Sequence, residues 1–251
     1  MGEAKRRKQV DPSYGRISNS ELPRGLVISC PIEIEGTSLH LKSPNLDAQE
    51  LRFALLFWDR LVWPISSVLH FGGDLNAEFL EGEGILSRPR YGIEGDVAQG
   101  MAHVQIRAFL ERERAEPGLW ALAQGENSLL LKEGFVEEGA GASVELHHAI
   151  PIPKHDVPLA EILEFKQRRR DELVRLRSHL EAFVSEIQES PDRSAELVKF
   201  VGEIDKDCAD LLKVGREWQC PVFLSDLKVC FSLTASKLLP AGAGHSVSHS
   251  G

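Results

Sequence analysis

The proline-rich stretch PIPKHDVP, residues 151–158, separates two differently patterned halves of the chain. Its alternating prolines stiffen an extended segment and prevent a helix from forming before the last of them. Beyond it, residues 162–187 carry an apolar side chain at nearly every third or fourth position, as in a coiled-coil helix. A polar break at residues 190–192 and a second apolar series at 197–211 follow. Residues 154–216 are therefore predicted to form a long antiparallel helical hairpin.

The half before this stretch mixes strand and helix patterns. Residues 26–34, LVISCPIEI, are rich in β-branched residues and predict a strand in which Pro31 marks an irregularity or an edge position. Asp47 followed by Glu50 resembles a capping box, and the helix that it starts is apolar on most sides. A second amphipathic helix is predicted from about residue 96 to 113, with Val97 on its apolar stripe.

Two later strand candidates, residues 128–132 and 143–152, are separated by a glycine-rich acidic stretch and predict a hairpin with a loose loop. The apolar segment at 220–239 is ordered in this interpretation, but its pattern leaves strand and helix both open. The predicted fold class is α+β, with a mixed α/β N-terminal domain followed by the helical hairpin.

Five regions result from these patterns. They are a mobile basic arm (1–21), an α+β domain (22–153), the helical hairpin (154–216), an ordered apolar segment (217–240) and a disordered tail (241–251).

Composition indicates an ordinary folded protein. Of its 251 residues 42% are hydrophobic and 27% are charged, and the net charge of −9 provides little long-range attraction for nucleic acid. The apolar runs are too short to span a bilayer, and the start of the chain does not resemble a secretory signal. The four cysteines have no paired spacing, which predicts reduced thiols in a cytoplasmic protein without a metal or cofactor.

Two basic clusters are candidate binding sites. The first, in the arm, consists of Lys5, Arg6, Arg7 and Lys8, and the second, at the start of the predicted hairpin, contains Lys166, Arg168, Arg169 and Arg170. Either could hold nucleic acid or an acidic partner. The simpler interpretation is a solvated terminus for the first cluster. For the second it is a helix face neutralised by ion pairs with neighbouring acidic residues.

Candidate catalytic residues are few. His148, His155 and Asp156 lie close in sequence, but the adjacent His147 and His148 point to opposite faces of a strand and cannot easily bind one metal ion together. Asp59 lies beside large aromatic residues, where a carboxylate needs a partner. A structural ion pair is the favoured role for Asp59, and a functional acid is the alternative.

The chain resembles an uncharacterised family of bacterial proteins, a domain of unknown function, over about residues 25–215. The resemblance rests on LLFWDRL at 55–61, EFL at 78–80 leading to GIL at 84–86, and ILEFK at 162–166 followed by RDEL at 170–173. It implies a bacterial cytosolic origin and a mixed α/β part followed by helices. No activity and no functional residue come with it.

These features predict a non-catalytic binding or regulatory component of a bacterial cytosolic protein assembly. The hairpin would offer a face to a protein partner or to a second copy. A role in stress or phage defence is suggested only by analogy with other bacterial families of unknown function. Two alternatives stay open: a hydrolase or nuclease with a site assembled from dispersed Asp, Glu and His residues, and nucleic-acid binding through the arm and the Lys166–Arg170 cluster.

Overall fold

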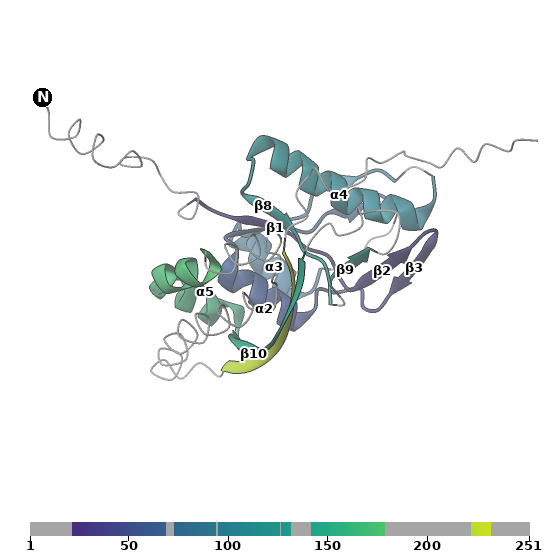
Figure 1. Cartoon of the computed structure of the whole chain (residues 1–251). Helices are drawn as coiled ribbons and strands as arrows, with labels where there is room; N and C mark the ends of the chain where they lie inside the picture. Colours follow the sequence, from purple (N-terminus) through teal and green to yellow (C-terminus); the bar gives the residue numbers. More distant parts are fainter. Residues whose placement is uncertain are drawn as a thin grey trace, which may run out of the picture.

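A four-stranded parallel sheet forms the centre of the protein, in a computed structural model that describes residues 22–68, 73–93, 95–125, 127–131, 142–178 and 222–231 (Figure 1). Its strands are β1 (Gly25–Val27), β4 (Arg60–Val62), β6 (Leu86–Ser87) and β8 (Trp120–Leu122). They lie in the order β6-β4-β1-β8, and β1 pairs in parallel with both β4 and β8.

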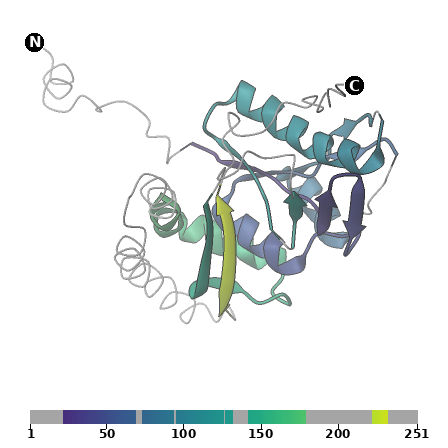
Figure 2. The ribbon, with the colours of Figure 1, turned by 45° about the vertical axis from the view of Figure 1, so that its right-hand side comes forward.

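Helices connect these strands in sequence order. They are α2 (Ala48–Phe57), α3 (Leu75–Gly82) and α4 (Val97–Ala115). Figures 1 and 2 show α4 on one side of the sheet and α2 on the other, so the sheet is covered on both faces. Such βαβ units produce parallel strands because each helix returns the chain to the same edge of the sheet. The mixture of helices and strands was predicted, but this parallel alternation was not.

Three of the four central strands continue after a short break that contains a proline. The break between β1 and β2 (Ile32–Glu35) contains Pro31, and the break between β4 and β5 (Ile65–Ser66) contains Pro64. Pro89 lies between β6 and β7 (Arg90–Tyr91). Proline cannot donate a hydrogen bond to a neighbouring strand, which explains why pairing is interrupted there. The predicted irregularity at Pro31 is confirmed.

Beyond the breaks, the strands separate into two smaller sheets. One has the order β3-β2-β9, with β3 (Ser38–Leu41) antiparallel and β9 (Leu129–Leu131) parallel to β2. The other is the parallel pair β5-β7.

The start of α2 follows the cap predicted at Asp47. The Asp47 carboxylate accepts hydrogen bonds from the backbone N–H groups of Gln49 and Glu50, both at 2.9 Å, and α2 begins at the next residue. All residues of α2 from Leu51 to Phe57 are buried, as predicted. The helix predicted at 96–113 is also present as α4, but its first residue, Val97, is 41% exposed and does not lie on the buried stripe that was predicted for it.

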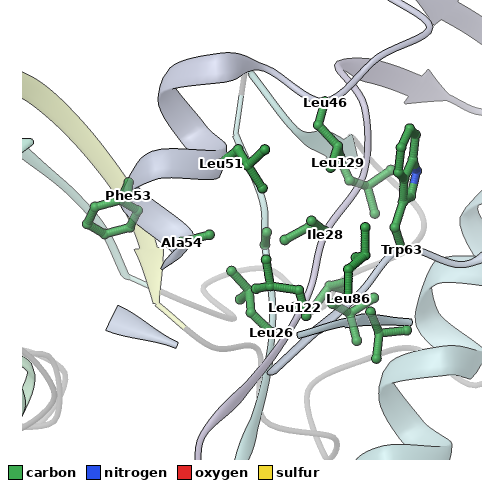
Figure 3. Packing of buried hydrophobic residues seen from close by; sticks show 14 of the residues in the cluster. Leu26, Ile28, Leu46, Leu51, Phe53, Ala54, Trp63, Leu86, Leu122 and Leu129 are labelled. Atoms are coloured by element: carbon green, nitrogen blue, oxygen red, sulfur yellow. The ribbon is translucent and has the colours of Figure 1, made fainter. Parts of the chain in front are cut away.

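One cluster of buried apolar side chains joins the sheet to α2. In Figure 3, Leu26 and Leu122 lie below Leu51 and Ala54 of α2, and Ile28 lies beside Ala54. The same cluster includes residues from the C-terminal part: Val157, Leu159, Ile162, Phe165, Leu173 and Leu176.

The predicted hairpin between residues 128–132 and 143–152 is wrong. β9 pairs in parallel with β2, while β10 (Ala142–Pro153) pairs antiparallel with β11 (Val222–Phe231) (Figure 2). The alternation of apolar residues identifies a strand without identifying its partner, and proximity in sequence was a poor guide here. The sequence left strand and helix both open for residues 220–239, and the structure shows a strand, β11, in that segment. The other strand of the pair, β10, lies against α2.

After the proline-rich stretch the chain is helical. α5 (Leu159–Arg168) packs against α2, and residues 170–178 are helical after a turn at Arg169. The rest of the predicted hairpin, the arm at 1–21 and the tail at 241–251 lie outside the described residues, so the hairpin stays a prediction. Within the described part of the chain, no helix is long and apolar enough to cross a membrane.

Candidate functional site

Asp59 lies between the end of α2 and the start of β4, and two cations from the C-terminal helices approach it. The carboxylate accepts a hydrogen bond from the backbone N–H of Arg24 at 2.9 Å. Lys166 Nζ lies 3.1 Å from Oδ1, and an Arg177 guanidinium nitrogen lies 3.8 Å from Oδ2. We call Arg24, Asp59, Lys166 and Arg177 the Asp59 cluster.

The same two cations cap the C-terminus of α2. Lys166 Nζ donates a hydrogen bond to the carbonyl of Trp58, and Arg177 donates one to the carbonyl of Phe57 at 2.9 Å. The last turn of α2 contains no basic residue of its own. Because helix C-termini expose unpaired carbonyls and carry partial negative charge, cations are stabilising there. The C-terminal helices thus supply a cap that α2 lacks.

The electrostatics of the cluster keep Asp59 ionised. Burial by itself would raise the pKa of Asp59, but Lys166, the Arg24 N–H and Arg177 outweigh it and lower the pKa below its ordinary value. Burial lowers the pKa of Lys166, and the Asp59 carboxylate opposes that shift. A carboxylate held in this way is a poor proton acceptor at neutral pH, and its contacts are those of a structural ion pair.

Two further contacts hold the proline-rich stretch onto α2. The side-chain amide of Gln49 donates to the carbonyl of Pro153 at 3.1 Å, and the buried guanidinium of Arg52 donates to the carbonyl of Val157 at 2.8 Å. Together with the Asp59 cluster, these bonds fix the start of the C-terminal half along the length of α2.

The other candidate catalytic residues are not joined to Asp59. His155 and Asp156 are exposed in the turn beside Val157, near the N-terminal half of α2, whereas Asp59 follows the opposite end of that helix. His148 lies in β10, and its side chain lies outside the described residues. Among the described residues, no group of three or more His, Cys, Asp or Glu side chains could hold a metal ion.

The basic cluster on α5 divides into inward and outward residues. The Lys166 side chain is only 18% exposed and takes part in the Asp59 cluster. Arg168 pairs with Glu164, and Arg169 pairs with Glu172 at 3.2 Å, while Arg170 is exposed. The arm residues Lys5, Arg6, Arg7 and Lys8 lie outside the described part of the chain.

Sequence reasoning identified Asp59 and Lys166 separately but missed their contact, and it missed Arg24 and Arg177. Lys166 follows the buried Ile162 by four positions, and Arg177 follows the buried Leu173 by four. Residues four apart share one face of a helix, so this spacing could have indicated cations on the buried stripe.

The carboxyl edge of the central sheet is a second candidate region for a ligand-binding site. Open parallel sheets commonly bind ligands where the strand order reverses, which here is between β1 and β8. In this protein β2 and β9 continue the two strands and pair with each other, and Ser29, Cys30 and Ser128 at the junction are buried. Burial also raises the pKa of the Cys30 thiol to about 11, which makes it unreactive as a nucleophile.

Comparisons with known proteins identify a family. Residues 30–251 match a family described as "Family of unknown function (DUF6236)". No curated protein matches the chain. No solved structure matches it either. Because the family match covers far more than half of the 251 residues and agrees with the resemblance found in the sequence, the chain belongs to this family of unknown function.

Proposed function

We propose that the protein is a non-catalytic binding component of a bacterial cytosolic protein assembly, docking through the helical C-terminal part. The observation that supports this proposal most is the Asp59 cluster. In this cluster Asp59, the best candidate for a catalytic acid, pairs with Lys166, the most buried cation of α5. The pair attaches the C-terminal helices to the sheet. A surface attached in this way is pre-organised, which reduces the entropy lost on binding.

The outward face of these helices has the mixed charge of a protein-binding surface. Its exposed polar residues are Glu161, Glu164, Gln167, Arg168, Arg170, Asp171 and Arg175. A surface with both signs of charge favours a partner whose charges complement it residue by residue, whereas a phosphate backbone favours a uniformly basic surface. The partner is therefore proposed to be a protein.

The two alternative functions have less support from the described residues. A nuclease or hydrolase centred on Asp59 would need that carboxylate free of Lys166 and Arg177. Nucleic-acid binding through α5 would need the charges of Arg168 and Arg169, which are paired with glutamates.

Affinity purification of the tagged full chain from its own cells tests the proposal, with nuclease treatment to remove captured nucleic acid. The variant Arg170→Glu/Arg175→Glu reverses two exposed charges on the outward face. The control Lys42→Glu/Arg114→Glu makes the same change in net charge on exposed residues outside these helices. The wild type and the control should retain one specific protein, and the Arg170→Glu/Arg175→Glu variant should retain about tenfold less of it.

If both variants captured equal amounts of the partner protein, the outward face of the helices would not be its binding surface. Capture that disappears with nuclease treatment would instead favour the nucleic-acid alternative.

A further inference from the structure

The strands β10 and β11 form a two-stranded ribbon. β10 packs against α2, and within the described part of the chain the ribbon contains no third strand. One edge of β11 is therefore left without a partner strand among these residues. An unpaired edge presents a row of backbone N–H and C=O groups that can pair with another strand.

Of the features that protect edge strands from pairing, β11 has the charged residues Asp226 and Lys228 but no proline. Its ten residues, VFLSDLKVCF, include no proline and no glycine, and it is longer than the typical strand of about five or six residues. By contrast, β10 contains Pro151 and Pro153, each of which removes a hydrogen-bond donor. Of the two strands, β11 is the one suited to recruiting a further strand.

We propose that β11 pairs antiparallel with β11 of a second copy of this chain, about a two-fold axis at Leu227. In this register Asp226 lies opposite Lys228 of the second copy, and the symmetry repeats this pair on the other side of the axis. Phe223 lies opposite Phe231 in the same arrangement. The two ribbons would form one four-stranded sheet, in which opposite charges face each other twice.

The charges select this register over its neighbours. Moving the axis by one residue places either Asp226 opposite Asp226 or Lys228 opposite Lys228. A parallel in-register pairing also places like charges side by side. Like charges directly opposite each other destabilise a sheet, so the Leu227-centred register is preferred.

The register within the ribbon extends the same charge pattern. β10 places Glu145 opposite Lys228. In the proposed dimer a lysine of each copy thus lies between two acidic positions, one from its own ribbon and one from the second copy. This interface is separate from the outward face of the C-terminal helices. The proposed dimer therefore does not depend on which protein binds to that face.

Sedimentation equilibrium and native mass spectrometry of the full chain test the proposal. The wild type should be a dimer at micromolar concentration. The variant Asp226→Lys places lysine opposite lysine, and the variant Glu145→Lys/Lys228→Asp places aspartate opposite aspartate while preserving the charge pair within the ribbon. Each variant alone should raise the dimer dissociation constant on the order of tenfold or more. An equal mixture of the two should restore dimers, now containing one copy of each.

Far-ultraviolet circular dichroism shows whether each variant is folded, and the mixture provides a gain of association that misfolding cannot produce. A wild type that stays monomeric would overturn the proposal. So would a dimer insensitive to both variants, or a mixture that forms no mixed dimer.

Discussion

At the scale of single residues, Asp59 shows how one carboxylate can connect segments that are distant in sequence. Its aromatic neighbours in the sequence indicated that it needs a partner, and the structure provides Lys166 and Arg177. The lysine and the Trp58 carbonyl that it binds are separated by 108 positions. Such a contact could not be predicted, because charge alone does not say which cation among many lies nearby.

Glu50 provides a prediction about pH. Burial, with the Asp47 carboxylate adding to it, raises the pKa of Glu50 to about 7. A carboxyl group whose pKa is raised by folding favours the folded state at acid pH, and this contribution is lost as the pH rises through the folded value. The variant Glu50→Gln mimics the protonated form and should therefore stabilise the protein above neutral pH, by about 2 kcal/mol.

Urea unfolding at pH 4 and pH 8 measures this effect. The variant and the wild type should have similar free energies of unfolding at pH 4 and differ at pH 8. The exposed Glu161, in the first turn of α5, provides the control Glu161→Gln, which should leave the difference near zero. A Glu50→Gln variant no more stable than the wild type at pH 8 would show that folding does not favour protonated Glu50.

At the scale of elements, α2, α4 and the first strand were predictable because their signals are local, whereas α3 was missed. Asp47 and Asp96 mark the starts of α2 and α4, and Pro31 marks the end of pairing after β1. Strand partners were not predictable in the same way. β10 pairs with β11 across a long separation in sequence, and the hairpin inferred from neighbouring strands was therefore wrong.

The contact between β1 and β8 depends on a glycine. A Cβ atom at Gly25 would lie 2.4 Å from the indole ring of Trp120. Two guanidinium groups contact that ring, with Arg60 at 4.9 Å and Arg112 at 5.5 Å from its centre, so it has little freedom to move. Gly25→Ala should lower the free energy of unfolding by about 2 kcal/mol or more.

Gly82, the last residue of α3, provides the opposite case. Among the described residues, nothing lies within 4 Å of a Cβ built there. Gly82→Ala should therefore raise stability by about 0.5 to 1 kcal/mol. Thermal unfolding followed by circular dichroism measures both variants, and a Gly25→Ala protein as stable as Gly82→Ala would contradict the packing described for β1.

At the scale of the whole molecule, the described C-terminal helices are continuous with the body of the protein. Ile162, Phe165, Leu173 and Leu176 share one apolar cluster with the sheet and α2. The change in sequence pattern at the proline-rich stretch was visible, but the burial of these residues against α2 depends on tertiary contacts that a pattern does not contain. The proposed docking surface is therefore tied to the sheet through α2 and the Asp59 cluster.

Hydrogen exchange of the full chain with the variant Asp59→Asn tests this attachment most directly. The substitution preserves size but leaves Lys166 and Arg177 without their counter-charge, which weakens the attachment by about 2 kcal/mol. Amides of α5 and of helical residues 170–178 should exchange roughly thirtyfold faster than in the wild type, while α4 keeps its wild-type rates. The exposed Glu81, in α3, provides the control Glu81→Gln, which should change neither. Wild-type exchange in α5 of the Asp59→Asn variant, or equal acceleration in α4, would contradict the conclusion that Asp59 fastens the C-terminal helices to the sheet.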